Sequence, residues 1–308
     1  MKRLRFAAWT LLALIGLVAV FPDFLSPYSP TRQHRDLAYA PPGRYREASV
    51  NWLAHGEPYR WIGLVPASRR LMTATGPGGI FLLGTDEFGR DWYSRLCHGA
   101  SISVILVPIA ALVSLLLAVA FGAWAGYQGG LVDLLVMRAS EVFVVVPWFY
   151  VVVGLRAALP LTLSAPATIF IVLSMLATLG CATPARLFRG LVLTLQSREF
   201  VLAARSAGAD GARIFRWHVL PFLLPTVWTQ FLLTLPAFII TEVTLSFLGL
   251  GVAEPTPTWG GMLAPLQQYA VFTSCPWMFA PAAAIVLVCL ALQIVGDAGA
   301  SSGPGVIA

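Results

Sequence analysis

The chain has 308 residues, of which 58% are apolar and 11% charged, with a net charge of +6 at pH 7. A soluble domain typically carries about 25% charged residues, so this composition argues against a soluble protein, and the scatter of its arginines between apolar runs argues against nucleic-acid binding. The single lysine, Lys2, follows only Met1, which excludes a Walker A phosphate loop and therefore ATP hydrolysis by this chain.

Six apolar segments approach the roughly 20 residues that a helix needs to cross a bilayer. They are residues 6–21, 102–127, 131–159, 165–183, 227–247 and 277–295. The first, preceded by three basic residues, fits either a signal peptide or an uncleaved anchor. Because Ala19-Val20-Phe21 ends in a bulky ring rather than a small residue, an uncleaved anchor helix within residues 1–25 is predicted.

The basic residues before the first segment place the N terminus in the cytoplasm. Six crossings then place residues 22–100 and 248–276 outside, and residues 184–226 and the C terminus inside. The inner loop 184–226 holds six arginines, which agrees with this orientation. The first outer segment holds nine, but segments longer than about 60 residues cross the membrane largely regardless of their charge.

Residues 26–98 are predicted to form an extracytoplasmic segment. Prolines and glycines are too frequent there for a regular helical pattern. A loop-rich cap is therefore expected, held partly by Trp52, Tyr59 and Trp61.

The four cysteines and four histidines show no metal-ligand spacing, and HExxH is absent. Cys181 and Cys289 lie in apolar runs, as small core residues do. Cys97 and Cys275 both fall on the outer side, so a disulfide between them is conceivable, although sequence spacing carries no information on proximity. No metal site is predicted.

Charged residues within membrane spans are costly and usually functional. Arg138 and Glu141 are three residues apart on one predicted helix and are expected to pair. Asp133, near the inner end of the third segment, is expected to cap that helix. Glu242, late in the fifth segment, faces either the transport pathway or a polar group of a neighbour.

Two prolines are expected to interrupt predicted spans: Pro147, before Trp148, in the third, and Pro236 in the fifth. Proline frees a backbone carbonyl that neighbours or a water-filled cavity must satisfy. Such breaks act as hinges, as pathway linings or as simple kinks. Arg156, near the outer end of the third span, is expected to extend its side chain to the headgroups.

Residues 197–221, between the fourth and fifth segments, carry the clearest local signals. The stretch from Glu199 to Ala207 contains good helix formers without Gly or Pro, and Gly208 can supply the left-handed position that ends a helix. Asp210 is then a natural N-cap for a second helix over residues 211–220. That helix is expected to stop near Pro221.

Small residues give the first of these helices a thin side, where a partner can approach the backbone: Ala203, Ala204 and Ala207. Arginines surround that side: Arg205, Arg213 and Arg216. The residues alone leave two interpretations open, a docking surface for a partner and an ordinary connector that positions the fifth span.

Seven residues of this loop resemble the EAA loop of ABC-importer permeases: Glu199, Ala203, Ala204, Gly208, Ile214, Leu220 and Pro221. In that family the loop is a coupling helix that sits in a groove of the cytoplasmic ATPase. Here Phe-Val-Leu lies between the glutamate and the first alanine, the offset that is usual in the peptide-permease branch. Phe222 departs from the pattern, because the family commonly has Asn there.

Further motifs extend the resemblance over roughly residues 80–297, in the order of the dipeptide, oligopeptide and nickel permease subfamily. They are Gly84-Thr-Asp-Glu-Phe-Gly-Arg-Asp91, Ser94-Arg95, Gly99-Ala-Ser-Ile-Ser103, Gly126-Tyr-Gln-Gly-Gly130, Asp133, Met137-Arg138, Glu141, Leu245-Ser-Phe-Leu-Gly-Leu-Gly251, Pro255-Thr-Pro-Thr-Trp-Gly-Gly-Met-Leu263 and Gly296-Asp297. Residues 46–83 look like the extracytoplasmic insert of the oligopeptide C-type permease. The uncharged tail 298–308 differs from the family's short basic tail.

The resemblance implies an all-α membrane protein of about six transmembrane helices with the type I importer fold over residues 99–298 and a tail at 299–308. It implies import of short peptides, or of a related solute such as nickel, across the bacterial inner membrane. The implied partners are a B-type second permease, two cytoplasmic ATPase subunits that bind the ATP, and an extracytoplasmic binding protein that contacts residues 30–80. In that family Glu199, Ala203, Ala204 and Gly208 would transmit motion, and the chain needs no cofactor of its own.

Two other classes compete with this interpretation. An intramembrane metalloprotease would need metal-ligand spacing, and the histidines lie outside the predicted spans. A stand-alone secondary transporter or channel would need coupling charges within its spans, whereas this chain concentrates charge in one inner loop.

Overall fold

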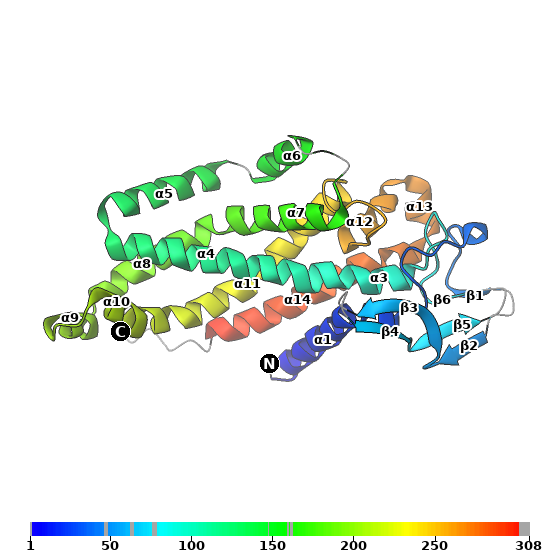
Figure 1. Cartoon of the computed structure of the whole chain (residues 1–308), viewed down its shortest axis with the longest axis horizontal. Helices are drawn as coiled ribbons and strands as arrows, with labels where there is room; N and C mark the ends of the chain where they lie inside the picture. The colour runs from blue at the N-terminus through cyan, green and yellow to red at the C-terminus, as the bar shows by residue number, and fades with distance from the viewer. Residues whose placement is uncertain are drawn as a thin grey trace. The chain divides into compact units, whose positions relative to one another are not determined.

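The computed structural model describes residues 2–45, 49–61, 65–75, 79–146, 148–158, 160 and 163–301. The chain divides into two compact units, whose helices and strands are labelled in Figure 1. Unit 1 comprises Met1–Pro108, Ser164–Ile169 and Ile239–Leu292, and unit 2 comprises Ile109–Leu163, Phe170–Phe238 and Gln293–Ala308. Four helices contribute residues to both units: α4 (Val107–Gln128), α7 (Ala165–Gly180), α11 (Leu220–Phe247) and α14 (Ala280–Ser301).

The remaining helices fall within single units. Unit 1 holds α1 (Lys2–Val20), α2 (Pro22–Leu25), η1 (Arg35–Leu37), α3 (Trp92–Ser101), η2 (Ile102–Leu106), α12 (Trp259–Leu263), η4 (Ala264–Gln267), α13 (Tyr269–Ser274) and η5 (Pro276–Phe279). Unit 2 holds α5 (Gly130–Val145), α6 (Trp148–Ala158), α8 (Ala182–Gln196), α9 (Glu199–Ser206), α10 (Gly211–Ile214) and η3 (Phe215–Val219).

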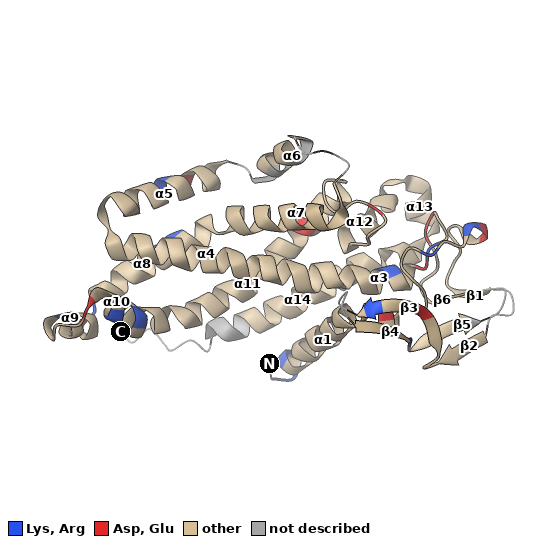
Figure 2. Cartoon of the chain, viewed as in Figure 1, with Lys and Arg blue, Asp and Glu red and all other residues tan. Residues whose placement is uncertain are grey.

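Five helical stretches in the described chain are long and apolar enough to cross a membrane. They are Lys2–Val20, Trp92–Gln128, Ala165–Gln196, Gly211–Phe247 and Pro276–Gly296. Five of the six predicted spans are thereby confirmed as long apolar helices. Most residues of these helices are uncharged (Figure 2), as contact with lipid tails requires.

The third predicted span is wrong as a single helix. The structure divides it into α5, of 16 residues, and α6, of 11 residues. Val146, which follows α5, is extended at φ −72° and ψ 122°, because a proline disfavours the helical conformation in the residue before it. Pro147 itself and the side chain of Arg156 lie outside the described residues.

In the fifth span the opposite error occurs, because both the break predicted at Pro236 and the helix end predicted near Pro221 are wrong. Helix α11 runs unbroken through Pro225 and Pro236, and no helix end falls at Pro221. A π-helical turn, η3, precedes Pro221, and the N–H of Leu220 donates to the carbonyl of Phe215. We attribute the continuity to this wider turn, which makes room for a ring that lacks an N–H. The π turn η2 stands in the same place before Pro108.

The segment predicted to be loop-rich contains six short strands. β1 (Gly43–Tyr45) pairs with β6 (Gly79–Phe81), β2 (Ser49–Trp52) with β5 (Met72–Thr75), and β3 (His55–Trp61) with β4 (Val65–Arg69), all antiparallel. The pairs are nested and form three two-stranded sheets, which we together call the β-ribbon. Each strand has one partner strand among the described residues, and such edge strands tolerate Pro58 and Pro66.

Two of the three aromatic residues expected to hold this segment do so. Trp61 donates from Nε1 to the Val20 carbonyl at 3.0 Å and stacks on Phe21, and the Tyr59 hydroxyl donates to the Arg69 carbonyl at 2.9 Å. Trp52 is 68% exposed, so its expected packing role is wrong. The ribbon is therefore fixed to the end of α1 by Trp61.

Candidate functional site

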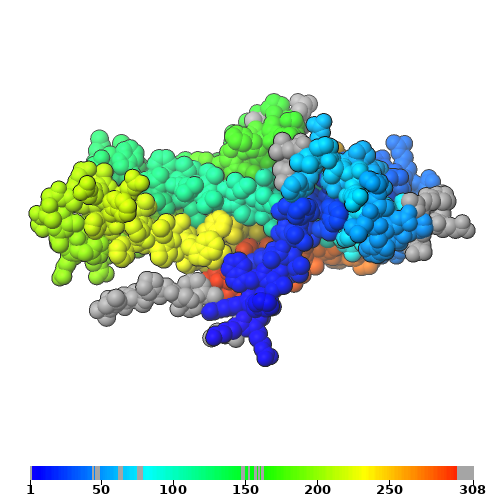
Figure 3. Space-filling model, turned by 60° about the horizontal axis from the view of Figure 1, so that its bottom comes forward, coloured from blue at the N-terminus to red at the C-terminus, as the bar shows by residue number. Residues whose placement is uncertain are grey.

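The coupling segment, residues 199–221, comprises α9, α10, η3 and the first two residues of α11, all in unit 2. It forms the yellow-green surface at the left of Figure 3. The boundary predicted at Gly208 is confirmed: α9 ends at Ser206, Ala207 is its C-cap, and Gly208 adopts a φ of 79°.

Two nested backbone hydrogen bonds close the end of α9. The N–H of Gly208 donates to the Arg205 carbonyl, and the N–H of Ala209 donates to the Ala204 carbonyl, each at 3.0 Å. This is the Schellman arrangement, which satisfies carbonyls that a helix end leaves free. A side chain at Gly208 would meet nothing within 4 Å, so only the left-handed backbone requires glycine there.

Asp210 occupies the predicted N-cap position without performing the expected side-chain role. Its backbone is extended, and its carbonyl accepts from the N–H of Ile214 at 2.9 Å, but its carboxylate makes no capping bond. The second helix is instead fixed from outside. The Tyr127 hydroxyl of α4 donates to the Gly211 carbonyl at 2.9 Å.

The structure buries part of the face of α9 that was predicted to be open. Val201 is fully buried in the core of unit 2, together with Phe188 and Val192 of α8, and Ala204 packs half-buried against the same core. Ala204 therefore does not belong to the open side. The exposed side carries Glu199, Ala203 and Ala207, which lie four residues apart on one face.

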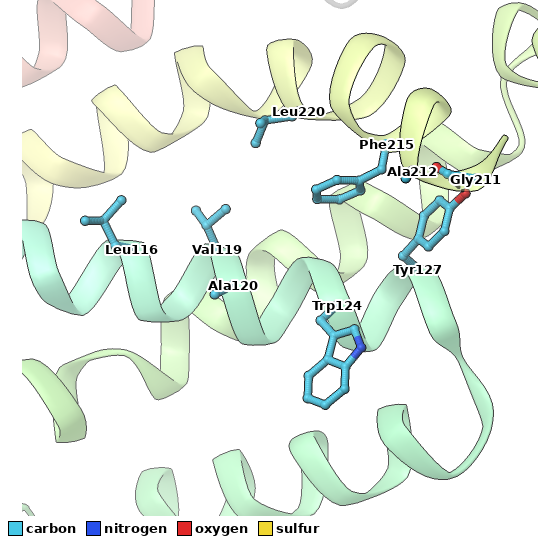
Figure 4. Close-up of a pocket in the computed structure, with 9 residues that line it drawn as sticks. All are labelled: Leu116, Val119, Ala120, Trp124, Tyr127, Gly211, Ala212, Phe215 and Leu220. Carbon is cyan, nitrogen blue, oxygen red and sulfur yellow. Dashed lines mark hydrogen bonds between the residues drawn. The ribbon is translucent and has the colours of Figure 1, made fainter. Parts of the chain in front are cut away.

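Of the seven residues that resemble the EAA loop, two of the last three pack inside the protein. Ile214 is 1% exposed and belongs to the core. Leu220 lines an apolar cavity of about 480 Å³ whose other wall is α4, including Val119, Trp124 and Tyr127 (Figure 4). Pro221 is exposed. Of the seven residues, Glu199, Ala203, Gly208 and Pro221 are accessible to a partner.

Phe222 links the two ends of the coupling segment. Its ring stacks on Phe200 of α9, with ring centroids 5.1 Å apart and an interplanar angle of 26°. Both side chains are nevertheless exposed. The aromatic residue at this position therefore ties the start of α11 to α9 directly.

Close backbone packing of α4 on α8 positions the segment. A side chain on Gly122 would collide with the carbonyl of Ala185, and one on Gly126 would lie 2.8 Å from the Arg189 carbonyl. The Gln196 amide donates to the Gly126 carbonyl at 2.7 Å. The Gly126 motif thus holds α8 against α4 just before the chain enters α9.

The charged residues of α5 make two ion pairs. Arg138 and Glu141 pair at 2.7 Å, which confirms that prediction. Asp133 does not cap α5, because the N-cap is Gly129; its carboxylate instead makes two bonds with the Arg189 guanidinium of α8, at 2.8 and 2.5 Å. A planar guanidinium fits a carboxylate in this two-point geometry.

Glu242 has polar partners within unit 1. It is 2% exposed and accepts hydrogen bonds from the hydroxyls of Ser246, at 2.7 Å, and Ser103, at 3.4 Å. Of the two alternatives for this residue, the structure places it with neighbouring polar groups. A buried carboxylate held by hydroxyls stabilises the approach of α11 to η2.

A buried charge cluster in unit 1 was missed as a site, although its residues lie in or beside the recognised motifs. Arg90 contacts Asp86 and Glu254, each at 2.6 Å, and Arg95 contacts Glu254 at 2.6 Å. The Glu254 carboxylate therefore bridges two arginines that are almost fully buried. The available signal was the single acid, Glu254, in the predicted outer segment 248–276.

The neighbouring Asp91 provides a test of pH dependence. It N-caps α3, accepting from the Ser94 N–H at 2.9 Å, and burial raises the pKa of its carboxyl from 3.8 to about 6. The Asp91 carboxyl therefore binds its proton more tightly in the folded state than in the unfolded state. As a result, the free energy of unfolding falls as pH rises from about 4 to 6, and it no longer depends on this group above pH 6.

Replacing Asp91→Asn keeps the cap oxygen and removes this titration. Thermal unfolding of the purified chain in detergent, followed between pH 4 and 7, should show a fall for wild type that exceeds that of the variant by on the order of 2 kcal/mol. Equal pH slopes for the two proteins would contradict the assignment.

Within the described part of the chain, no group of three His, Cys, Asp or Glu side chains is placed so that it could hold an ion. Cys97, Cys181, Cys275 and Cys289 are free thiols. The disulfide conceivable between Cys97 and Cys275 is therefore not formed in this structure.

Comparison with known proteins agrees with this architecture. The family described as "Binding-protein-dependent transport system inner membrane component" matches residues 118–300. The chain is 32% identical over 297 residues to the dipeptide transport system permease protein DppC of Bacillus subtilis, covering 96% of this chain and 80% of that protein.

Two further relatives carry different names. The oligopeptide transport system permease protein OppC of Bacillus subtilis is 35% identical over 215 residues, 70% of this chain and 68% of that protein. The nickel transport system permease protein NikC of Escherichia coli is 35% identical over 226 residues, 72% of this chain and 78% of that protein.

Proposed function

The chain belongs to the family of binding-protein-dependent transport system inner membrane components, and from that premise we propose that it imports short peptides. It is a transmembrane permease subunit of an ABC importer of the peptide and nickel group. Relatives named for dipeptides and oligopeptides support the peptide proposal, while a nickel permease at similar identity makes nickel the alternative substrate.

The coupling role rests on one observation. Helix α9 presents an exposed face with Glu199 and Ala203, while Val201 on its other side is buried in the core. A short helix anchored on one side and open on the other is suited to sit in a groove of a partner. We therefore assign α9 as the element that engages an ATPase subunit.

Motion of α9 has a direct route into the membrane. The segment from Gly211 to Phe247 is continuously helical, and Phe200 of α9 stacks on Phe222 near its start. A displacement of α9 therefore carries the start of α11 with it. Such rigid movement of packed helices supports alternating access, in which ATP binding and release on other subunits switch the open side.

The proposed assembly contains four kinds of subunit. This chain and a second permease form the pore, two cytoplasmic subunits bind and hydrolyse ATP, and an extracytoplasmic protein delivers the solute to residues 30–80. The permease domain is proposed to span residues 99–298, with both termini in the cytoplasm. Its exposed apolar helices are suited to the inner membrane.

Uptake by the complete assembly tests this function. The chain is co-reconstituted in vesicles with its second permease, ATPases and binding protein, and entry of labelled alanyl-alanine and of Ni²⁺ is followed with and without ATP. Dipeptide accumulation that requires both ATP and the binding protein is expected. Accumulation of Ni²⁺ alone would contradict the peptide assignment, and uptake without the ATPases would indicate a stand-alone transporter.

A further inference from the structure

A charged groove in unit 2 lies between α5 and α8, apart from the coupling segment. Its volume is about 440 Å³, within the range of small-molecule sites. Five of its seven lining residues are charged: Asp133, Arg138, Glu141, Arg186 and Arg189. On α5, Asp133, Met137 and Glu141 lie four residues apart on one face, and on α8 Arg186 and Arg189 share a face.

The charges of this groove do not balance. Asp133 is neutralised by Arg189, and Glu141 by Arg138. Arg186 is exposed and has no acidic partner among the described residues. The groove therefore presents one uncompensated guanidinium beside two ion pairs. Such a site attracts an anion and repels a bare divalent cation.

The exposed ion pair on α5 indicates what this face of the protein contacts. Glu141 lies eleven residues beyond Gly130, where α5 begins, and therefore about 16 Å further along the helix. Its pair with Arg138 is largely exposed on the surface of this chain. Lipid tails do not solvate exposed ion pairs, so this face of α5 contacts water or protein rather than lipid. In a permease subunit, a face that contacts water can belong to the transport pathway, including its cytoplasmic end.

We propose that the α5–α8 groove is a carboxylate subsite on this pathway, with Arg186 as the receiving side chain. The proposal rests on the permease function proposed above and narrows its substrate to solutes that carry a carboxylate, as peptides do at their C terminus. A guanidinium binds a carboxylate through two parallel hydrogen bonds. The two ion pairs keep the neighbouring carboxylates from occupying Arg186.

The test compares three variants in the complete reconstituted importer. Arg186→Gln removes the charge, Arg186→Lys keeps the charge without the planar fork, and Arg3→Gln, on an exposed residue of α1, is the matched control. At limiting alanyl-alanine, uptake is expected to fall about tenfold in R186Q and about threefold in R186K. R3Q should match wild type.

Two further readouts separate substrate binding from a structural role. ATP hydrolysis stimulated by the binding protein, and recovery of the second permease on purification, should both stay at wild-type levels in R186Q. Loss of either together with uptake would show that Arg186 holds the assembly together and would overturn the proposal. Uptake by R186Q at the wild-type rate would overturn it as well.

Varying the lipids of the vesicles and the solute supplied distinguishes a peptide carboxylate from other anions that Arg186 could bind. In vesicles of phosphatidylcholine alone the R186Q defect should equal that in vesicles containing phosphatidylglycerol, and its disappearance there would assign Arg186 to a lipid headgroup instead. Ni²⁺ supplied with histidine tests a metal chelate as the source of the carboxylate. A defect confined to that complex overturns the peptide subsite, whereas absence of dipeptide uptake by wild type would refute the proposed function itself.

Discussion

Replacing Gly208 by proline is expected to abolish co-purification of the ATPase subunits and ATP-dependent uptake, while the chain still inserts in the membrane. Gly208 has a φ of 79°, and its N–H donates to the Arg205 carbonyl. Proline is fixed near a φ of −65° and has no N–H, so it can adopt neither feature. The closure of α9 is lost at a cost on the order of 2 kcal/mol, and the arrangement of its exposed face is lost with it.

The matched control is Gly208→Asn. Asparagine tolerates the left-handed conformation better than other side chains, and its Cβ would meet nothing within 4 Å. This variant should retain most ATPase binding and uptake. If Gly208→Pro also retained both, α9 would be an ordinary connector and the coupling assignment would fail.

The coupling segment shows how far local sequence signals extend. Glycine after a run of helix formers predicted the end of α9 correctly, because the left-handed position depends on the residue itself. The same pattern placed Ala204 on the open side, yet it packs half-buried on the core. Which face of a short helix is buried depends on the core against which it packs, and that core includes residues of α4, which is distant in the sequence, as well as of the adjacent α8.

The prolines show the same division between local and tertiary effects. Val146 before Pro147 leaves the helical conformation, as a local rule predicts. Pro236 and Pro221 nevertheless lie in a continuous helix, and at Pro221 a preceding π turn accommodates the ring. The β-ribbon was missed for a related reason. Its strands have three to seven residues, and their partners lie up to 38 residues away, from Gly43 to Phe81.

The ion pair that was predicted joins neighbouring residues, and those that were missed join residues far apart in the sequence. Arg138 and Glu141 are neighbours on one helix turn and were predicted. Asp133 and Arg189 are 56 residues apart, and Arg95 and Glu254 are 159 apart. No spacing rule connects such residues, and only the fold brings them together. The buried charge cluster around Arg95 and Glu254 therefore gives the second large expected effect.

Replacing Glu254→Ala is expected to destabilise the chain by about 2 kcal/mol, because the half-exposed Glu254 carboxylate is the main partner of a buried guanidinium. The Arg95 side chain is 1% exposed and contacts Glu254 at 2.6 Å, and its only other acidic partner in the described chain is Asp86, at 3.6 Å. Arg90 still keeps Asp86 at 2.6 Å, so Arg95 carries most of the loss.

An exposed ion pair in the same unit supplies the control. Arg32 and Glu57 meet at 2.8 Å, but this arginine is 47% exposed whereas Arg95 is 1% exposed, so water compensates it and Glu57→Ala should cost less than about 1 kcal/mol. Thermal unfolding in detergent compares the two variants, and uptake should follow stability, because Arg95 lies on α3, which continues into the α4 span. Equal unfolding midpoints would mean that solvent, rather than Glu254, compensates Arg95, and the cluster would then not secure this end of unit 1.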